Sequence, residues 1–206
     1  MINTGPPAGT ARGHVVYVSA VSLKHHVVRL RDRGTVLGTR SLGAEVAKEI
    51  RASDPAVGAL ILDFSAVRVA SSPFLDEIVC AVRSTIADNP DRYVVSAGLN
   101  EDVLDTVQLV AERRGIALAV LQTDRLHVIG GKRHLEETLA AAQELGSFTA
   151  PQLAERLELK LPNLHQRLLQ LQNAGVITRT DDTSAARGRR LLFGTPDPGE
   201  LAKSIC

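Results

Sequence analysis

The segment from Thr149 to Leu192 constrains the fold of this chain more than any other, because its expected elements follow one another in a specific order. A short helix is predicted to begin after Thr149, with Gln152 three residues further on, which is the spacing of a capping box. A tight turn follows, and then a second helix over Pro162–Ala174 that stops at Gly175. A strand, a loop and another strand complete the segment. We interpret this order as a winged helix-turn-helix, which places a helix and a hairpin side by side.

The second helix is predicted to have two different faces. Leu164, Leu168 and Leu171 recur at helical spacing and would anchor it to the core. The opposite face carries amides, with one arginine at its edge, and these side chains suit hydrogen bonds to base edges in a major groove. The candidates for DNA contact on this helix are Asn163, Gln166, Arg167, Gln170 and Asn173. The loop between the two strands would add phosphate contacts through Arg187, Arg189 and Arg190.

The stretch Leu164–Ile177 resembles the recognition helix and following turn of bacterial winged-helix repressors, particularly the ArsR- and MarR-like groups. Those groups typically show an HLxxLxxAGLV-like pattern at this point, and the resemblance covers roughly residues 134–194. It implies that the C-terminal region binds double-stranded DNA. The polar residues can also be read as no more than a solvated helix face, and winged helices also bind proteins, so both interpretations stay open.

Composition limits the other possibilities. The net charge of the 206 residues is +1, so any affinity for nucleic acid must come from a local patch. Two cysteines, Cys80 and Cys206, cannot form a disulfide framework, which fits a reducing compartment. No apolar run approaches the ~18 residues of a membrane span, and no signal peptide is recognisable. We therefore expect a cytoplasmic protein with no membrane contact.

The first 130 residues alternate strand-like and helix-like segments, which predicts an α/β fold with a mixed sheet. The expected strands cover residues 14–19, 25–30, 57–62, 93–97, 116–121 and 125–129, and the first two are expected to form a hairpin. The expected helices cover residues 41–52 and 73–87 and the stretch between Asn100, a helix N-cap, and Gly115. Short, continuous apolar runs such as residues 57–62 are typical of strands that are buried on both faces.

The chain is predicted to have four parts, and the boundary between its two domains lies at Gly130-Gly131-Lys132, where the character of the sequence changes. Residues 1–13, rich in Gly, Pro and Thr, are expected to be a flexible tail. Residues 14–131 would form the α/β domain, and residues 132–195 the small winged-helix domain. Residues 196–206, which begin with a turn-like run, are expected to be a C-terminal tail.

A second candidate site lies in the α/β domain between Asp63 and Glu77. A buried strand is predicted to end at Asp63, and a turn holding Ser71 and Ser72 leads into a helix that Pro73 opens. The two hydroxyls are well placed to cap the helix. A phosphate added to one of them would meet free backbone amides at the helix N-terminus.

These residues resemble the STAS domain of anti-sigma-factor antagonists, and more closely a STAS-like family of unknown function. That family typically shows a Gly-x-Arg-x-Leu-Gly run, a strand that ends in Asp-Phe, and Ser-Ser-x-Phe-x-Asp-Glu. The corresponding residues here are Gly38–Gly43, Asp63-Phe64 and Ser71–Glu77, and the resemblance spans about residues 25–120. In the antagonists a partner kinase phosphorylates a serine of this loop, which falls on Ser72. The resemblance thus implies a protein partner, a kinase or ATPase, at this domain.

Arg40, Asp76 and Glu77 have two interpretations. They could form, with the serine loop, a polar surface that recognises a partner or a ligand. Asp76 and Glu77 could instead complement the helix dipole. Neither alternative needs a cofactor.

No phosphate-binding glycine loop, catalytic triad or metal-ligand spacing is recognisable, so we expect neither an enzyme nor a bound metal or other cofactor. The favoured hypothesis is a regulator whose STAS-like domain receives a signal or a partner and whose winged helix binds operator DNA. A homodimer is expected, because one recognition helix reads only a few base pairs. Candidates for its interface are Leu135, Leu139 and Leu169. The alternative is a partner-switch protein whose winged helix contacts protein and not DNA.

Overall fold

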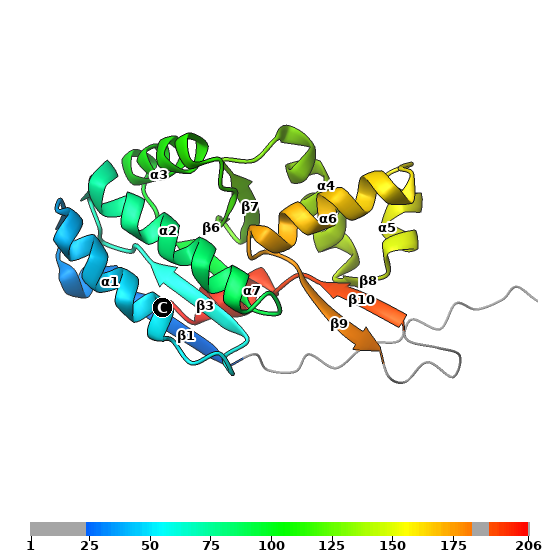
Figure 1. The fold of residues 1–206 in the computed structure, drawn as a ribbon, viewed down its shortest axis with the longest axis horizontal. Coiled ribbons are helices and arrows are strands. Elements are labelled where there is room, and N and C mark those ends of the chain that lie inside the picture. Colours follow the sequence, from blue (N-terminus) through cyan, green and yellow to red (C-terminus); the bar gives the residue numbers. More distant parts are fainter. Residues whose placement is uncertain (1–23, 183–189, 206) are drawn as a thin grey trace, which may run out of the picture.

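The computed structural model describes residues 24–182 and 190–205, and a five-stranded sheet forms its centre (Figure 1). The strands lie in the order β1-β3-β5-β6-β7. The first four are parallel, whereas β7 pairs antiparallel with β6. Their bounds are His25–Arg29 for β1, Ala59–Asp63 for β3, Tyr93–Ala97 for β5, Leu118–Gln122 for β6 and Arg125–Ile129 for β7. The predicted α/β class with a mixed sheet is confirmed.

Of the two strands predicted to form a hairpin, the structure describes only the second. Residues 14–19 lie outside the described residues, as does the tail predicted for residues 1–13. The second predicted strand forms β1, which pairs in parallel with β3. Parallel neighbours need a long crossover connection, and a helix supplies it here.

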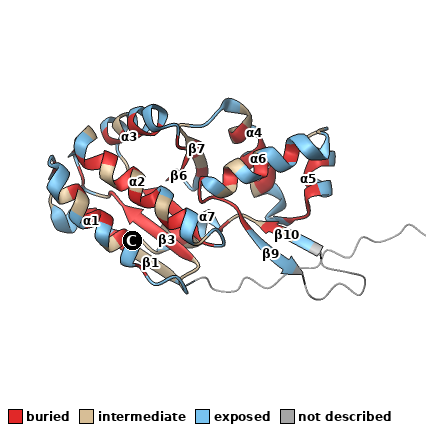
Figure 2. Cartoon of the chain, in the orientation of Figure 1, coloured by how far each residue is buried: buried red, intermediate tan, exposed pale blue. Residues whose placement is uncertain are grey.

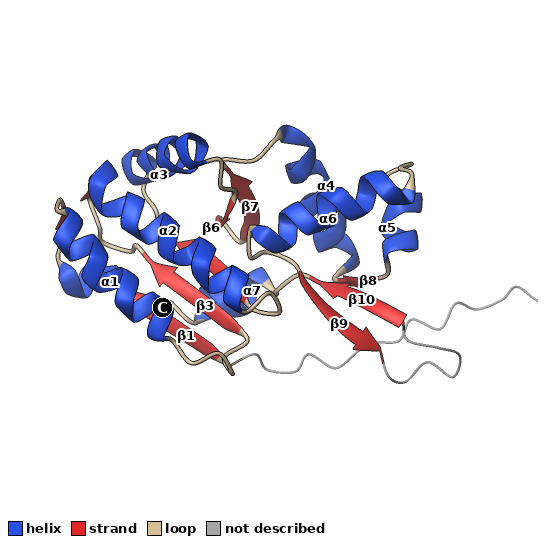
Figure 3. Ribbon diagram, viewed as in Figure 1, coloured by secondary structure: helices blue, strands red, loops and turns tan. Residues whose placement is uncertain are grey.

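Three helices cover one face of the sheet (Figure 3). They are α1 (Arg40–Ala52), α2 (Ser72–Asp88) and α3 (Glu101–Arg114), and each lies between two parallel strands in the chain. The strand order advances in one direction, so right-handed crossovers put all three helices on the same side. Val46, Ile78 and Val107 of these helices belong to one buried cluster with Leu60 and Val94 of the sheet.

A small parallel sheet fixes the start of α2. It pairs β2 (Val36–Leu37), which follows the short 3-10 helix η1 (Leu30–Arg33), with β4 (Val69–Ala70). Directly after β4, the N–H of Ser71 donates a hydrogen bond to the carbonyl of Leu37 at 2.9 Å. The first residues of α2 are thus held against the segment that leads into α1.

The remaining elements follow in the order α4 (Arg133–Leu145), β8 (Ser147–Phe148), α5 (Ala150–Arg156), α6 (Leu161–Asn173), β9 (Thr178–Asp182), β10 (Arg190–Gly194) and α7 (Pro198–Lys203). The strands form an antiparallel sheet in the order β8-β10-β9. The N–H of Thr149 donates to Oε1 of Gln152 at 2.8 Å, as the predicted capping box requires. The rings of Phe148 and Phe193 stack with centroids 5.9 Å apart.

The two regions share one hydrophobic core. Ile61 and Val95, on the sheet face opposite α1–α3, belong to the same buried cluster as Leu139 of α4 and Leu164 of α6. Buried residues accordingly run without a break from the sheet into α4, α5 and α6 (Figure 2). The predicted boundary near Lys132 marks where the chain leaves the sheet, but it does not separate two cores.

Polar contacts also join the two regions. The N–H of Val94 donates to the carbonyl of Gly175 at 2.9 Å. The hydroxyl of Thr178 donates to the hydroxyl of Tyr93 at 2.8 Å, and both residues are buried. A side chain at Gly175 would come within 3.1 Å of the Val94 backbone, so this turn approaches the sheet as closely as a glycine allows.

The C-terminal segment differs from the prediction of a tail over residues 196–206. Asp197 caps α7, because its carboxylate accepts from the N–H of Gly199 at 2.7 Å and that of Glu200 at 3.3 Å. Leu201 is 1% exposed and lies in the shared core. The Asp-Pro-Gly run that looks like a turn is here a helix start, with a capping aspartate and a proline in the first turn.

Among the helices that the structure describes, none combines the length and the apolar character needed to cross a membrane.

Candidate functional site

The first candidate site is the surface formed by α6 and the strands beside it. Leu164, Leu168 and Leu171 are buried, which confirms the predicted inner face of α6. Outward, Asn163 and Gln166 are exposed as predicted. The centre of the outer face also includes Leu169, whose side chain is among the most exposed apolar groups at 57%.

The other predicted contact residues of α6 differ from these two in what surrounds them. Arg167 is directed toward α4, where its Nη1 donates to Oγ1 of Thr138 at 3.1 Å and to the carbonyl of His134 at 3.4 Å. The sequence places Arg167 at the edge of the amide face, and in the structure that edge is the flank of α6 that packs on α4. Gln170, which is half-buried, and Asn173, which is exposed, also line a cavity between α6 and α2.

The phosphate contacts predicted for the loop fall on residues 187–190, most of which the structure does not describe. Arg187 and Arg189 lie outside the described residues. Arg190 begins β10, where only its backbone is described.

A groove separates α6 from the N-terminus of α5 and from β9 and β10, with a cavity volume of about 650 Å³. The register pairs Arg179 with Phe193 and Asp181 with Leu191, so these side chains share one face of the sheet. On that face Phe193 is buried in the core, whereas Leu191, two residues before it, is 43% exposed. The residues that line the groove include His165, Leu169, Gln172, Arg179 and Leu191.

Sequence reasoning missed His165, Leu169, Arg179 and Leu191 as groove residues. The helical period that identifies the buried leucines of α6 also turns His165 and Leu169 away from them, so this part was open to prediction. The facing side chains of β9 and β10 depend on strand register. That register could not be read from the sequence without the length of the connecting loop.

The described charges around this surface are mixed. Lys160, before α6, and Arg179, on β9, are exposed. Glu155, Glu158 and Asp181 are exposed as well. Arg156 forms an ion pair with Glu144 of α4 and so does not add a separate positive charge.

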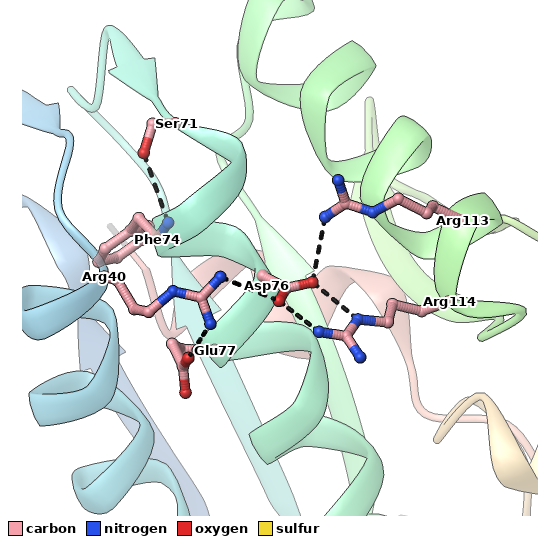
Figure 4. A network of polar contacts seen from close by, with 7 residues as sticks. All are labelled: Arg40, Ser71, Phe74, Asp76, Glu77, Arg113 and Arg114. Atoms are coloured by element: carbon pink, nitrogen blue, oxygen red, sulfur yellow. Dashed lines mark hydrogen bonds and ion pairs between the residues drawn. The ribbon is translucent and has the colours of Figure 1, made fainter.

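The second candidate site surrounds Asp76 on α2 (Figure 4). Its side chain is only 4% exposed, and it contacts guanidinium groups from two other helices. Arg114 donates from Nε to Oδ1 at 2.7 Å and from Nη2 to Oδ2, which makes the pair bidentate. Arg113 donates to Oδ1 at 3.2 Å. From α1, Arg40 places Nη2 3.6 Å from Oδ2 and donates from Nη1 to Oε1 of Glu77 at 3.0 Å.

The arginines keep Asp76 ionised. The hydrogen bonds from Arg114, with the positive charges of Arg114 and Arg113, hold the pKa of the Asp76 carboxyl below its usual range, although burial acts in the opposite direction. The same contact raises the pKa of Arg114. Asp76 lies beyond the first turn of α2, so its interpretation as a complement to the helix dipole is wrong. Its carboxylate interacts with the side chains of arginines and not with the N-terminal backbone amides of the helix.

The serine loop lies at the start of α2. Oγ of Ser71 accepts a hydrogen bond from the N–H of Phe74 at 3.4 Å and donates to the carbonyl of Gly38 at 2.7 Å. The predicted capping role is thus confirmed for Ser71. Ser72 is the first residue of α2 and is half-buried, and its hydroxyl has no hydrogen-bond partner among the described residues.

Of the residues predicted for this site, the structure brings Arg40, Asp76 and Glu77 into one network and puts Ser71 at the nearby start of α2 (Figure 4). Arg113 and Arg114 were missed. They end α3, where two basic residues also complement the helix dipole, so nothing local links them to an aspartate 37 or 38 positions earlier. In the described part of the chain, no group of three or more His, Cys, Asp and Glu residues is placed to hold a metal ion.

Comparison of the sequence with models of known families finds no match, and comparison with curated proteins finds none either.

Proposed function

We propose that this chain is a DNA-binding regulator whose residues 132–195 act as a winged helix. The observation that carries the proposal is the order of α5, α6, β9 and β10 together with the two faces of α6, one buried and one exposed and largely polar. In this proposal α6 enters the major groove. Asn163 and Gln166 would contact base edges, because their amides can pair with adenine in a bidentate way.

Cations beside α6 support contacts to the DNA backbone. Lys160 precedes the first turn of α6, and Arg179 lies in the groove next to this helix. Both would neutralise phosphates, which gives affinity and salt dependence but little sequence choice. We expect the arginines predicted between β9 and β10 to act in the same way.

The α/β region would receive the signal in this proposal. Asp76 and Glu77 hold exposed arginines, Arg40 among them, in a polar surface near the serine loop, and such a surface suits the docking of a protein partner. We infer that a kinase or ATPase binds there. Ser71 is engaged in capping, so Ser72 is the better candidate for modification.

We further propose that the protein acts as a homodimer in the cytoplasm, where operator DNA is found. Two copies would pair two half-sites and thereby supply the specificity that one helix lacks. Leu135 and Leu139 are not available for the interface, because they are 3% and 0% exposed in the core of the same chain. Leu169 is the predicted interface residue that stays exposed.

A second candidate function is the binding of a protein by the groove beside α6. The observation that favours it is that Leu169 and Leu191, 57% and 43% exposed, line the same groove. Exposed apolar side chains grouped in a recess are typical of protein contacts. In this alternative the apolar groove binds a side chain of a partner, and DNA is not bound.

The discriminating experiment is a selection of duplex DNA from a random pool with the full chain at two salt concentrations. We expect an enriched motif, and we expect Gln166→Ala to relax the preference at one position of it. Arg179→Gln should weaken binding to all sequences and reduce the salt slope by about 1. Gln108→Ala, which removes an exposed amide from α3, is the control. If no duplex is retained at low salt, the DNA proposal is rejected in favour of the protein-binding groove.

A further inference from the structure

A cavity of about 590 Å³ lies where the α/β region meets α6. Its walls come from the C-terminal half of α2, the connection between α3 and β6, the turn before α4, and the end of α6. Small-molecule sites typically have volumes of about 300–1,000 Å³ and form where two regions of a protein meet. The size and the position of this cavity both fit such a site.

Four polar side chains from three elements line the cavity. Arg83 comes from α2, Lys132 from the turn that caps α4, and Gln170 and Asn173 from α6. None of the four side chains forms a hydrogen bond or an ion pair with another described residue. Arg83, Lys132 and Asn173 are exposed and Gln170 is half-buried, so a ligand in the cavity can take the place of the water that solvates these groups.

The charge of the lining selects an anion. Arg83 and Lys132 are the charged residues of the lining, both positive, and no carboxylate belongs to it. The N-terminus of the 13-residue helix α4 lies at the same wall, and Lys132 at its N-cap position provides no side-chain cap. The positive end of that helix adds to the attraction for a negative group. Two cations and a helix end fit a dianion better than a single negative charge.

The rest of the lining is apolar. Ile86, Ile116, Ala117 and Leu135 form this part of the cavity wall. These side chains pack largely in the core, and an apolar body attached to the anion, unlike a free inorganic anion, would cover the apolar edges that they present to the cavity together with the exposed Ala87.

We propose that this cavity binds a phosphate monoester with a small apolar body. Arg83 and Lys132 bind the phosphate, and the apolar body lies against Ile86 and Ile116. The amides of Gln170 and Asn173 bind polar atoms of the same molecule. This ligand bridges α2, α4 and α6, three elements that lie far apart in the sequence.

Occupation of the cavity also affects α6. If α6 contacts DNA, the ligand and the DNA change each other's affinity by the same factor, because the coupling between two sites is reciprocal. This last step rests on the proposed function. The binding of the ligand itself does not.

The test is isothermal titration calorimetry of the full chain with phenyl phosphate at pH 8, where the phosphate is a dianion. Inorganic phosphate and phenol, titrated separately, supply the two halves of the probe. We expect one site for phenyl phosphate and weaker binding of either half. The calorimetric measurement contains no DNA, so a failure of the DNA proposal leaves its outcome unchanged.

Variants place the binding in the cavity. Arg83→Gln and Lys132→Gln should each weaken phenyl phosphate binding about tenfold or more, as the loss of a charged hydrogen bond does. Ala87→Phe should block it by filling the cavity, because Ala87 belongs to the lining and is exposed. Arg51→Gln, at an exposed arginine of α1, is the matched control. No binding of phenyl phosphate, or binding that all these variants leave unchanged, would overturn the proposal.

Discussion

The carboxylate of Asp76 meets three arginines from two helices, α1 and α3, although its own side chain is only 4% exposed. The arginines themselves stay about half exposed, so water solvates the outer part of each guanidinium. Removal of the carboxylate would leave them in water and not as buried, unpaired charges. Asp76 therefore joins α1, α2 and α3 at one point while the arginines remain partly exposed.

The first prediction concerns the pH dependence of this network. The pKa of Asp76 is lowered in the folded state, so its stabilisation is present above the unfolded pKa, about 4, and is lost as the pH falls through the folded value. Asp76→Asn should lower the free energy of unfolding by about 1–3 kcal/mol at pH 7. Urea unfolding from pH 7 down to pH 3 should show this difference shrinking toward the acid end. Asp91→Asn, at an exposed aspartate, is the control; a difference that does not change with pH would contradict the prediction.

The second prediction concerns Gly43, which belongs to the Gly-x-Arg-x-Leu-Gly run. A Cβ at this position would lie 2.7 Å from the carbonyl oxygen of Phe74, so α1 and α2 would have to separate. Gly43→Ala should lower the free energy of unfolding by about 1–3 kcal/mol, the usual cost of overpacking. Gly38→Ala offers a matched control, because a Cβ there has nothing within 4 Å. If the two variants lower the free energy of unfolding in urea by equal amounts, the close approach of Gly43 to Phe74 is not what makes an added side chain destabilising.

At the scale of elements, α6 and α7 show how the surroundings of a helix decide its role. The outer face of α6 combines Gln166 with Leu169, and its C-terminal end faces α2 through Gln170 and Asn173. α7 is short, yet Leu201 is buried, and Oγ of Ser204 lies 2.5 Å from Nδ1 of His25 on β1. The C-terminal segment thus packs on the edge strand of the sheet.

The third prediction tests whether α7 belongs to the core. Leu201→Ala should lower the free energy of unfolding by about 2–4 kcal/mol, as large-to-small changes of buried leucines do. Lys203→Ala, at an exposed position of the same helix, should have little effect. Chemical denaturation of both variants checks this. If they are equally stable, α7 behaves as the tail that the sequence suggested.

At the scale of the molecule, the shared core makes the α/β region and the region from α4 onward one packing unit. Its buried cluster includes strands β3, β5 and β6 together with α4, α5 and α6. The hydrogen bond between Thr178 and Tyr93 joins residues 85 positions apart inside it. A signal that moves the α/β region would therefore act directly on the elements that hold α6.

The fourth prediction follows from this packing. The full chain should unfold in a single cooperative transition, with equal midpoints by circular dichroism and by tyrosine fluorescence. Tyr93→Phe should shift the whole transition and lower the free energy of unfolding by about 0.5–1.5 kcal/mol, because it leaves Thr178 without its partner. The Tyr93→Phe variant keeps one tyrosine, Tyr17, so its transition is followed by circular dichroism. Two separate transitions would show that the regions fold independently.

The sequence by itself determined much of the local structure, because caps, glycines and hydrophobic periods act over a few residues. The predicted bounds of β5 and β7 agree with the structure, as do the cap at Asn100, the helix end at Gly115 and the buried face of α6. The tertiary structure alone decided the arginine partners of Asp76, the inward direction of Arg167, the burial of Leu135 and Leu139, and the packing of α7. Each of these depends on residues distant in the chain, which meet only when helices and strands pack around a common core.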